Sequence, residues 1–304
     1  MHTRTEHTMQ DIRNMQDTES GVGGMAVTRR GALAAAAVAL AAPALAACSS
    51  DEGATQGSAA SGADSKLTVA MELAYPPFET KDDAGEPAGV SVDFMRAFGE
   101  AYGYDVTIEN TAFDGLIPSL QTGRADCVMS SITITPEREE TVDFSDPYAQ
   151  AQLAILANSE SGIAEAADLD QEGMTVAVKT GSTGDVYATN HLENAEILRL
   201  ADESACVTEV VQGRADGFLY DQLTIYRNHE ANPDTTEAVF IPFQDPEYWG
   251  IAVQKGNTEL LDQLNEFIAQ SRADGTFDAL TEKYLAQEKA AFDELGFTWF
   301  FDFE

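Results

Sequence analysis

Apolar residues between positions 67 and 286 alternate between short continuous runs and stretches with helical spacing. The runs that have the length of buried strands are 67–71, 106–108, 125–129 and 174–178. Between the first two runs, the spacing of apolar residues predicts a helix over 93–104, which Gly103 ends. Alternating strands and helices are typical of a parallel α/β sheet.

The most informative stretch of the chain is 113–148. A short apolar helical stripe there is closed by Gly123, and the strand that follows leads into the polar residues 130–133. A new helix is predicted to begin directly afterwards, with Thr135 as its N-cap and Pro136 at its first position. A helix start therefore opens beside a strand end, which is where open α/β sheets bind ligands.

Arg138 is the candidate anion-binding residue of this stretch. It stands where a capping box would place Glu or Gln, so it is free to face an external anion. The alternative is a structural role, in which Arg138 pairs with Glu139 or Asp143.

Several motifs along the chain resemble those of the amino-acid-binding solute-binding proteins of bacterial ABC importers, the extracellular solute-binding protein family 3. Besides the stretch 113–148, the motifs are AYPPFE at 74–79, GVSVD at 89–93, VKTGST at 178–183 and RADGTF at 272–277. The resemblance covers about 66–286. It implies an α/β fold of the type II periplasmic-binding-protein kind, with two lobes, each a mostly parallel sheet flanked by helices, and two hinge crossovers.

We predict that the folded part divides into lobe 1 (66–157 and 249–286), lobe 2 (158–248) and an aromatic C-terminal tail (287–304). A weak internal repeat supports two related lobes. QTGRAD at 121–126 is echoed by VQGRAD at 211–216, and each is followed by an apolar strand that ends in a polar group. For the tail, we expect packing on the first lobe, with an exposed patch for a partner as the alternative.

Residues 1–47 are predicted to be an export signal, with translation starting at Met25. Twin arginines precede an apolar run, 31–47, that is too short for an ordinary transmembrane helix. The twin arginines suggest the Tat route, but Ala32 replaces the usual Phe of that motif, so Sec export remains open.

The apolar run ends in LAAC at 45–48, which resembles a bacterial lipobox whose cysteine, Cys48, receives a lipid. The residues after it are rich in Ser, Gly, Ala and Asp and have no apolar periodicity, so 48–65 is predicted to be the lipidated cysteine and a flexible tether. We therefore expect an extracytoplasmic protein that is anchored to the cell membrane.

The composition excludes some functions without selecting one. Hydrophobic residues make up 44% and charged residues 23% of the chain, which is ordinary for a globular protein. The net charge of −35, from 52 acidic and 17 basic residues, argues against binding to nucleic acid or to anionic lipid.

A free amino acid carries a carboxylate and an ammonium group, so its receptor needs a planar cation and an anion. The resemblance implies that Arg138 binds the carboxylate with help from Thr133 and the turn at 182–183, and that Asp221 binds the ammonium with Ser130. The full set of predicted ligand-binding residues is Glu72, Tyr75, Phe113, Ser130, Ser131, Thr133, Arg138, Lys179, Ser182, Thr183, Tyr220 and Asp221.

For the ligand side chain, the resemblance implies a sandwich between Tyr75 and Phe113, with Ile132 nearby. A carboxylate at Glu72 would repel acidic ligands and welcome an amide or a cation, whereas Lys179 would oppose a cation and welcome a carbonyl. An amide satisfies both groups, so glutamine is the first choice. Arginine, lysine and histidine come second, in the case that Lys179 turns to solvent.

The predicted function is that of a substrate-binding lipoprotein, not an enzyme, which closes on a polar amino acid and delivers it to an ABC permease. We expect a monomer that binds no cofactor and no nucleic acid. The chain has no H-E-x-x-H, paired-cysteine or G-x-S-x-G motif, so metal and catalytic-triad chemistry are unsupported. Cys127 and Cys206 are predicted to be free thiols, one in each lobe. The alternatives are an exported enzyme of the cyclohexadienyl or arogenate dehydratase type, with Glu72 as acid, and an extracytoplasmic amino-acid sensor.

Overall fold

The structure is a computed structural model that describes residues 65–303. The predicted export signal, Cys48 and residues 49–64 of the tether lie outside the described residues. All of the elements below belong to one unit of the chain, Ala60–Glu304.

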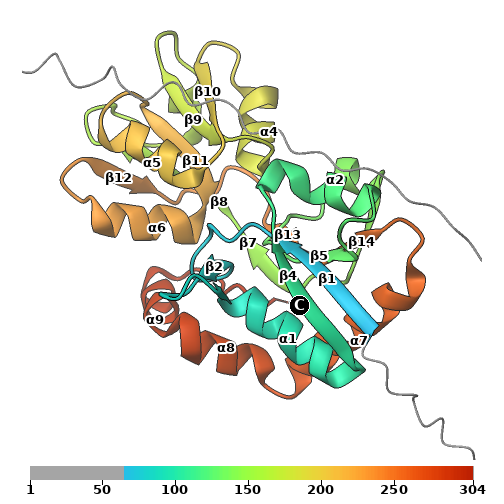
Figure 1. Cartoon of the computed structure of the whole chain (residues 1–304). Coiled ribbons are helices and arrows are strands. Elements are labelled where there is room, and N and C mark those ends of the chain that lie inside the picture. Colours follow the sequence, from blue (N-terminus) through green and yellow to red (C-terminus); the bar gives the residue numbers. More distant parts are fainter. Residues whose placement is uncertain (1–64, 304) are drawn as a thin grey trace, which may run out of the picture. The chain divides into compact units, whose positions relative to one another are not determined.

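Two five-stranded sheets form the frame of the described part (Figure 1). The first sheet consists of β1 (Ser65–Met71), β4 (Tyr104–Asn110), β5 (Cys127–Val128), β6 (Val142–Phe144) and β14 (Ala252–Gln254). The second consists of β8 (Leu153–Asn158), β9 (Thr175–Lys179), β10 (Glu196–Leu200), β11 (Gly217–Asp221) and β12 (Thr236–Val239). We call the parts built on them lobe 1 and lobe 2.

The two sheets share one topology. Their orders are β4-β1-β5-β14-β6 and β10-β9-β11-β8-β12. In each sheet the first three strands are parallel and the last two join antiparallel. The mostly parallel sheets of the two-lobed fold are therefore present in both lobes.

Two neighbouring strands connect the lobes. β7 (Ala149–Ala151) and β13 (Glu247–Trp249) pair antiparallel, and each leads from a strand of one sheet to a strand of the other. A small hairpin in lobe 1, β2 (Thr80–Lys81) with β3 (Pro87–Ala88), lies apart from both main sheets. The β7–β13 pair provides the two predicted hinge crossovers.

Helices cover both faces of each sheet. In lobe 1 these are α1 (Val90–Tyr102), α2 (Leu116–Gln121), α3 (Pro136–Glu139), α7 (Thr258–Ala273), α8 (Thr276–Tyr284) and α9 (Ala286–Leu295), with a 3-10 turn η1 (Phe113–Gly115). In lobe 2 they are α4 (Thr183–His191), α5 (Glu203–Val211) and α6 (Gln222–Ala231), with η2 (Ala166–Leu169).

Strand alternation explains how a sheet serves two cores. In β8, Ile155 packs with α4 on one face, while Ala154 and Leu156 pack with α5 and α6 on the other. In β1, Val69 joins the large core under α1 and α7, whereas Ala70 joins the smaller core under α2. Successive side chains of a strand point to opposite faces, so a continuous apolar run is the pattern that a doubly covered strand requires.

The internal repeat of the sequence corresponds to equivalent structure in the two lobes. The carboxylate of Asp126 accepts a hydrogen bond from the Thr68 N–H at 2.7 Å, and Asp216 accepts one from the Thr175 N–H at 2.7 Å. Asp126 thus ties the start of β5 to β1, and Asp216 ties the start of β11 to β9.

Some predicted boundaries were wrong. Residues 153–157, which the sequence analysis predicts in lobe 1, belong to strand β8 of the lobe 2 sheet. An apolar run of strand length carries no information about which sheet it joins, because both faces of both sheets are buried. The predicted strand 125–129 is shorter, Cys127–Val128, and the helix predicted over 93–104 begins earlier, at Val90.

The C-terminal tail packs into the lobe 1 core. Its first half is helix α9, which ends at Gly296 with a left-handed φ of 75°. Phe292, Trp299 and Phe300 lie in the same apolar cluster as the β1 and α1 side chains. The Phe300 carbonyl also accepts a hydrogen bond from the N–H of Gln150 in the hinge strand β7, at 2.8 Å.

Candidate ligand-binding site

A cavity of about 460 Å³, partly open to solvent, lies where strand ends of both sheets meet the hinge strands. Its lining residues are Glu72, Tyr75, Phe113, Ser130, Ser131, Thr133, Arg138, Leu153, Ser182, Thr183, Tyr220, Asp221, Glu247 and Trp249. Every residue predicted to bind ligand, except Lys179, is in this set.

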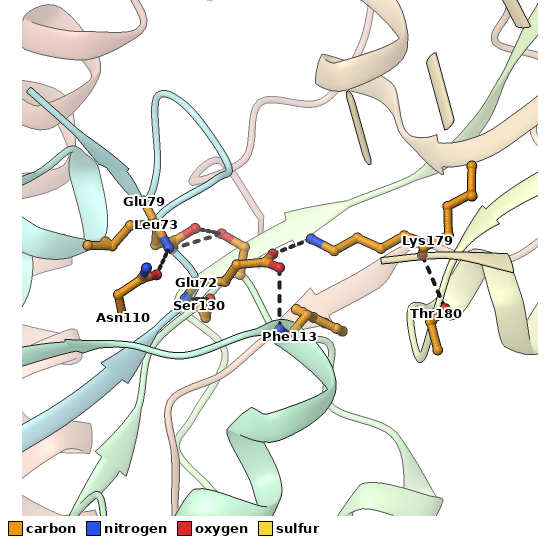
Figure 2. A network of polar contacts seen from close by, with 10 residues as sticks. Glu72, Leu73, Glu79, Asn110, Phe113, Ser130, Lys179 and Thr180 are labelled. Atoms are coloured by element: carbon orange, nitrogen blue, oxygen red, sulfur yellow. Dashed lines mark hydrogen bonds and ion pairs between the residues drawn. The ribbon is translucent and has the colours of Figure 1, made fainter. Parts of the chain in front are cut away.

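Lys179 lies directly behind the wall of the cavity and joins the two lobes. Its ammonium forms an ion pair with Glu72 Oε2, and both side chains are buried (Figure 2). The other oxygen, Oε1, accepts a hydrogen bond from the Phe113 N–H at 3.3 Å. Glu72 follows β1 and Lys179 ends β9, so the pair joins the carboxyl ends of equivalent strands in the two lobes.

Aromatic rings form one wall of the cavity. The Phe113 ring centroid lies 5.0 Å from Lys179 Nζ and 5.7 Å from the Arg138 guanidinium carbon. Tyr75 contacts Tyr220 edge to face, with ring centroids 6.1 Å apart. These rings present apolar faces and favourable quadrupoles to cations and aliphatic stems.

Arg138 is held by backbone carbonyls of both lobes. One terminal nitrogen donates to the Thr133 carbonyl at 2.7 Å, and the other donates to the Gly181 carbonyl at 3.0 Å. Thr135 caps the short helix as predicted, since its hydroxyl accepts the Arg138 N–H at 3.3 Å. Arginine has five N–H donors, so this arrangement leaves three of them for other acceptors. The alternative pairing with Glu139 or Asp143 is absent from the ion pairs of the described residues.

Asp221 ends β11 and caps helix α6. Its Oδ1 accepts hydrogen bonds from the N–H groups of Leu223 at 2.9 Å and Thr224 at 3.1 Å. Its Oδ2 is buried and has no partner among residues 65–303, and the same is true of the Tyr75 hydroxyl. Burial raises the pKa of Asp221 above its ordinary range, against the effect of the capping bonds and of the Tyr75 hydroxyl, which is near the carboxylate without a well-formed hydrogen bond to it. An unpartnered buried carboxylate oxygen in a cavity wall is a binding point for a hydrogen-bond donor or cation.

Glu247, in hinge strand β13, is a cavity residue that the sequence did not reveal. Its Oε2 accepts hydrogen bonds from the hydroxyls of Thr133 at 3.0 Å and Thr183 at 2.8 Å, one from each lobe. Burial raises the pKa of Glu247, while these bonds and the nearby Arg138 lower it.

All three predicted serines have structural partners. The hydroxyl oxygen of Ser130 accepts the Glu72 N–H at 2.9 Å. Ser182 caps helix α4, because its hydroxyl oxygen accepts the Asp185 N–H at 3.2 Å. Ser131, which has a left-handed φ of 47°, donates its hydroxyl hydrogen to Glu79, with both carboxyl oxygens at 3.1 Å. Ser131 and Ser182 both line the cavity, but these bonds use part of the hydrogen-bonding capacity of their hydroxyl groups.

Beneath the cavity, Glu79 is completely buried, with an exposed fraction of 0%. Besides Ser131, its partner is the hydroxyl of Ser91 at the start of α1. Burial raises the pKa of Glu79 to about 8, although the hydrogen bonds from the two serines lower it. The sequence did not mark Glu79 as a buried acid, because glutamates are rarely fully buried and nothing local singles this one out.

Glu203 is a partly buried acid whose carboxyl end is enclosed, and the sequence did not predict it. Its Oε2 has no partner within the described residues. Burial and the charge of nearby Asp221 raise the pKa of Glu203 to about 8. It stands in the first turn of α5, where an acidic residue is usually a solvated helix-start residue.

One predicted neighbour of the ligand lies elsewhere. Ile132 is 1% exposed and packs in the smaller lobe 1 core with Leu116 and Val142, away from the cavity lining. Its neighbours Ser131 and Thr133 line the cavity, and Ile132 between them faces the opposite side, as alternation along an extended segment would give. Within residues 65–303 no cluster of three or more His, Cys, Asp or Glu side chains is arranged to hold a metal ion.

Two lobes of equal topology, joined by paired hinge strands and sharing a cavity at their strand ends, define a type II periplasmic binding protein. The family model of the bacterial extracellular solute-binding proteins, family 3, matches residues 67–287. This chain belongs to that family.

Similar proteins cover most of the chain. A probable histidine-binding protein of Neisseria gonorrhoeae is 32% identical over 257 residues, which are 84% of this chain and 95% of that protein. The crystal structure of an ancestral amino acid-binding protein, described as a precursor of cyclohexadienyl dehydratase, is 37% identical with a TM-score of 0.66 and covers 72% of this chain and 94% of that one. An ancestral arginine-binding protein bound to glutamine is 33% identical with a TM-score of 0.68, and covers 74% of this chain and 100% of that one.

Helices long and apolar enough to cross a membrane are absent from residues 65–303.

Proposed function

We propose that this protein is the substrate-binding component of an ABC importer, and that it captures a polar amino acid by closing its two lobes. The observation that carries the proposal is the pair of anchors in one cavity. Arg138 is held with donors to spare, and Asp221 has a buried oxygen without a partner in the described part of the chain. A zwitterion satisfies both.

The carboxylate of the ligand is assigned to Arg138, with the hydroxyls of Thr133 and Thr183 beside it. A charge-assisted hydrogen bond contributes roughly 1.5 to 3 kcal/mol when it is well made. The ammonium is assigned to Asp221 Oδ2, with the hydroxyls of Tyr75 and Ser130 as further partners. These groups come from both lobes, so the ligand favours the closed arrangement.

For the ligand side chain, we propose an amide first and a cation second. The ion pair of Lys179 with Glu72 offers a donor and acceptors next to each other at the aromatic wall. A glutamine amide donates through its NH₂ and accepts through its oxygen, so it matches both halves of the pair. A cationic side chain is the second candidate, because relatives are named for histidine and arginine.

The test is a thermal-shift panel of the twenty amino acids, followed by calorimetric titration of the best ligand. A ligand that binds the folded state stabilises it by roughly 2.7 kcal/mol at a hundredfold excess over its dissociation constant. Arg138→Ala should abolish the shift, while Arg96→Ala, which removes an exposed arginine of α1, should preserve it. A panel in which glutamate, aspartate or only branched apolar residues shift the melting point most would contradict the assignment of Glu72 and Lys179.

The competing proposal is an exported dehydratase on the same fold, which the ancestral precursor of cyclohexadienyl dehydratase brings into consideration. Glu72 was our candidate acid for that reaction. Both of its oxygens accept hydrogen bonds, from Lys179 and from the Phe113 N–H, so neither is placed to give a proton to a substrate. Incubation of the pure protein with prephenate or arogenate should therefore give no product.

We further propose that the protein is exported and attached to the cell membrane through lipidated Cys48, by the Tat or the Sec route, and that it acts as a monomer with membrane permease subunits. The support is the lipobox-like LAAC sequence at the end of the apolar run, followed by the polar residues 49–64.

A further inference from the structure

The side chain of Glu247 occupies the part of the cavity that we assign to the ligand carboxylate. It comes from hinge strand β13 and reaches between Thr133 of lobe 1 and Thr183 of lobe 2. Its second oxygen, Oε1, accepts a hydrogen bond from the Gln244 side chain at 2.8 Å. Every donor around this carboxylate therefore belongs either to the proposed ligand site or to the segment before β13.

The hydrogen atoms available to a second carboxylate can be counted. A threonine hydroxyl has one hydrogen to donate. The hydroxyls of Thr133 and Thr183 each direct theirs to Glu247 Oε2. A ligand carboxylate that used the same two hydroxyls would have to take those hydrogens from Glu247.

The negative charge of Glu247 also disfavours a second carboxylate at this place. Arg138 is the cation next to Glu247, and the two influence each other's ionisation. A second carboxylate beside the first shares that single cation and is repelled by the first. The backbone next to Glu247 is fixed, because the Tyr248 carbonyl accepts the Ile134 N–H at 2.8 Å. Any release of the carboxylate is thus a rotation of the side chain.

We propose that Glu247 is an internal competitor of the ligand, whose carboxylate is displaced from Thr133 and Thr183 when the α-carboxylate of the amino acid binds. This inference rests on the proposed function. Glu247 sets the affinity of the site, since each ligand must exchange its carboxylate for one that the protein already provides.

The experiment compares amino-acid binding by the wild type, Glu247→Ala and Glu247→Gln in the full folded protein, by calorimetric titration with the best ligand of the panel. Two hydrogen bonds no longer have to be broken in Glu247→Ala, so its affinity should rise roughly tenfold. Glu247→Gln keeps an acceptor oxygen but loses the charge, so it should bind with intermediate affinity. Glu237→Ala, which removes an exposed carboxylate of β12, is the matched control and should bind like the wild type.

Thr183→Val provides a second reading. In the wild type, the Thr183 hydroxyl donates to Glu247 before binding and to the ligand carboxylate after it. Removing the hydroxyl costs one hydrogen bond in both states, so the affinity should change little. In the Glu247→Ala background the hydroxyl serves only the ligand, so the same substitution should weaken binding several-fold. If Thr183→Val changes the affinity by the same factor in the wild type and in Glu247→Ala, the proposal that the two carboxylates compete for this hydroxyl is wrong.

Unchanged or weaker binding by both Glu247 variants, with the wild type still binding amino acids, would overturn the competitor role and leave the proposed function standing. If neither the wild type nor Glu247→Ala binds any amino acid, the proposed function itself fails, and this inference fails with it.

Discussion

Replacing Glu79 with glutamine should make the protein more stable at alkaline pH. The carboxyl group is fully buried between Ser91 and Ser131, and burial raises its pKa to about 8. Between its ordinary value of 4.5 and about 8, the folded protein keeps this proton while the unfolded chain has lost it. Stability therefore falls as the pH rises through this window and is constant above it.

The size of the effect follows from the width of the window. From 4.5 to about 8 is a span of about 3.5 pH units. At 1.36 kcal/mol per unit, the contribution of Glu79 to the free energy of unfolding falls by about 5 kcal/mol across it. Glutamine has the shape of the protonated acid, and its NH₂ can donate to a serine oxygen in place of the acid O–H. Glu79→Gln should thus match the wild type within about 1 kcal/mol at pH 5 and exceed it by several kcal/mol at pH 9.

The assay is urea denaturation followed by far-UV circular dichroism at pH 5, 7 and 9. Glu203 has a pKa raised in the same direction, so the wild type should lose more than the Glu79 contribution alone. The difference between wild type and Glu79→Gln isolates the one group. Glu86→Gln changes an exposed carboxylate of the same segment and should give a difference that is small at every pH. If the difference for Glu79→Gln is equally constant with pH, the buried carboxyl does not hold a proton and the reasoning is refuted.

Three further predictions concern the anchors and the cysteines. Asp221→Asn keeps a good N-cap for α6 but loses the negative charge, so amino-acid affinity measured by calorimetry should fall roughly tenfold to a hundredfold while the melting temperature changes little; unchanged affinity would contradict the ammonium assignment. Cys48→Ala should move the protein from the membrane fraction to the soluble extracytoplasmic fraction, and continued membrane retention without lipid would exclude the tether. Cys127 and Cys206 are free and buried, and burial raises the pKa of Cys206 to about 12 and that of Cys127 further, so alkylation without reductant should label neither in the native protein and both in urea. Rapid labelling of either in the native state would show that its core opens.

The sequence predicted the fold well where its signals were local and repeated. The N-cap Thr135 and the QTGRAD echo both correspond to what the structure contains, because capping and strand-start bonds depend on residues close in sequence or on a repeated pattern. The lobe boundary failed at 153–157. That strand is apolar on both faces, and nothing within it distinguishes one doubly covered sheet from the other.

In the site, the resemblance located side chains but not their partners. Glu72 and Lys179 were expected to offer separate groups to a ligand, whereas they pair with each other over a sequence separation of 107 residues. Glu247 was missed altogether, since a glutamate before an aromatic pair has no local signature. Its role depends on two threonines that lie 114 and 64 residues away. Contacts between the lobes depend on how the two lobes come together. Periodicity and short motifs describe only residues that are close in the sequence, so they do not predict these contacts.

The polar contacts at the cavity give a physical reason why binding and closure should be one event. The ion pair of Glu72 with Lys179 and the bond from Arg138 to the Gly181 carbonyl both run from lobe 1 to lobe 2. Opening the lobes would separate both contacts. A buried charge that loses its partner raises the free energy of the protein unless water reaches it. These contacts favour closure but do not satisfy the buried oxygen of Asp221. A zwitterion that reaches from Arg138 to Asp221 would add a charged link between the same two lobes, so the closed form gains most when an amino acid completes it.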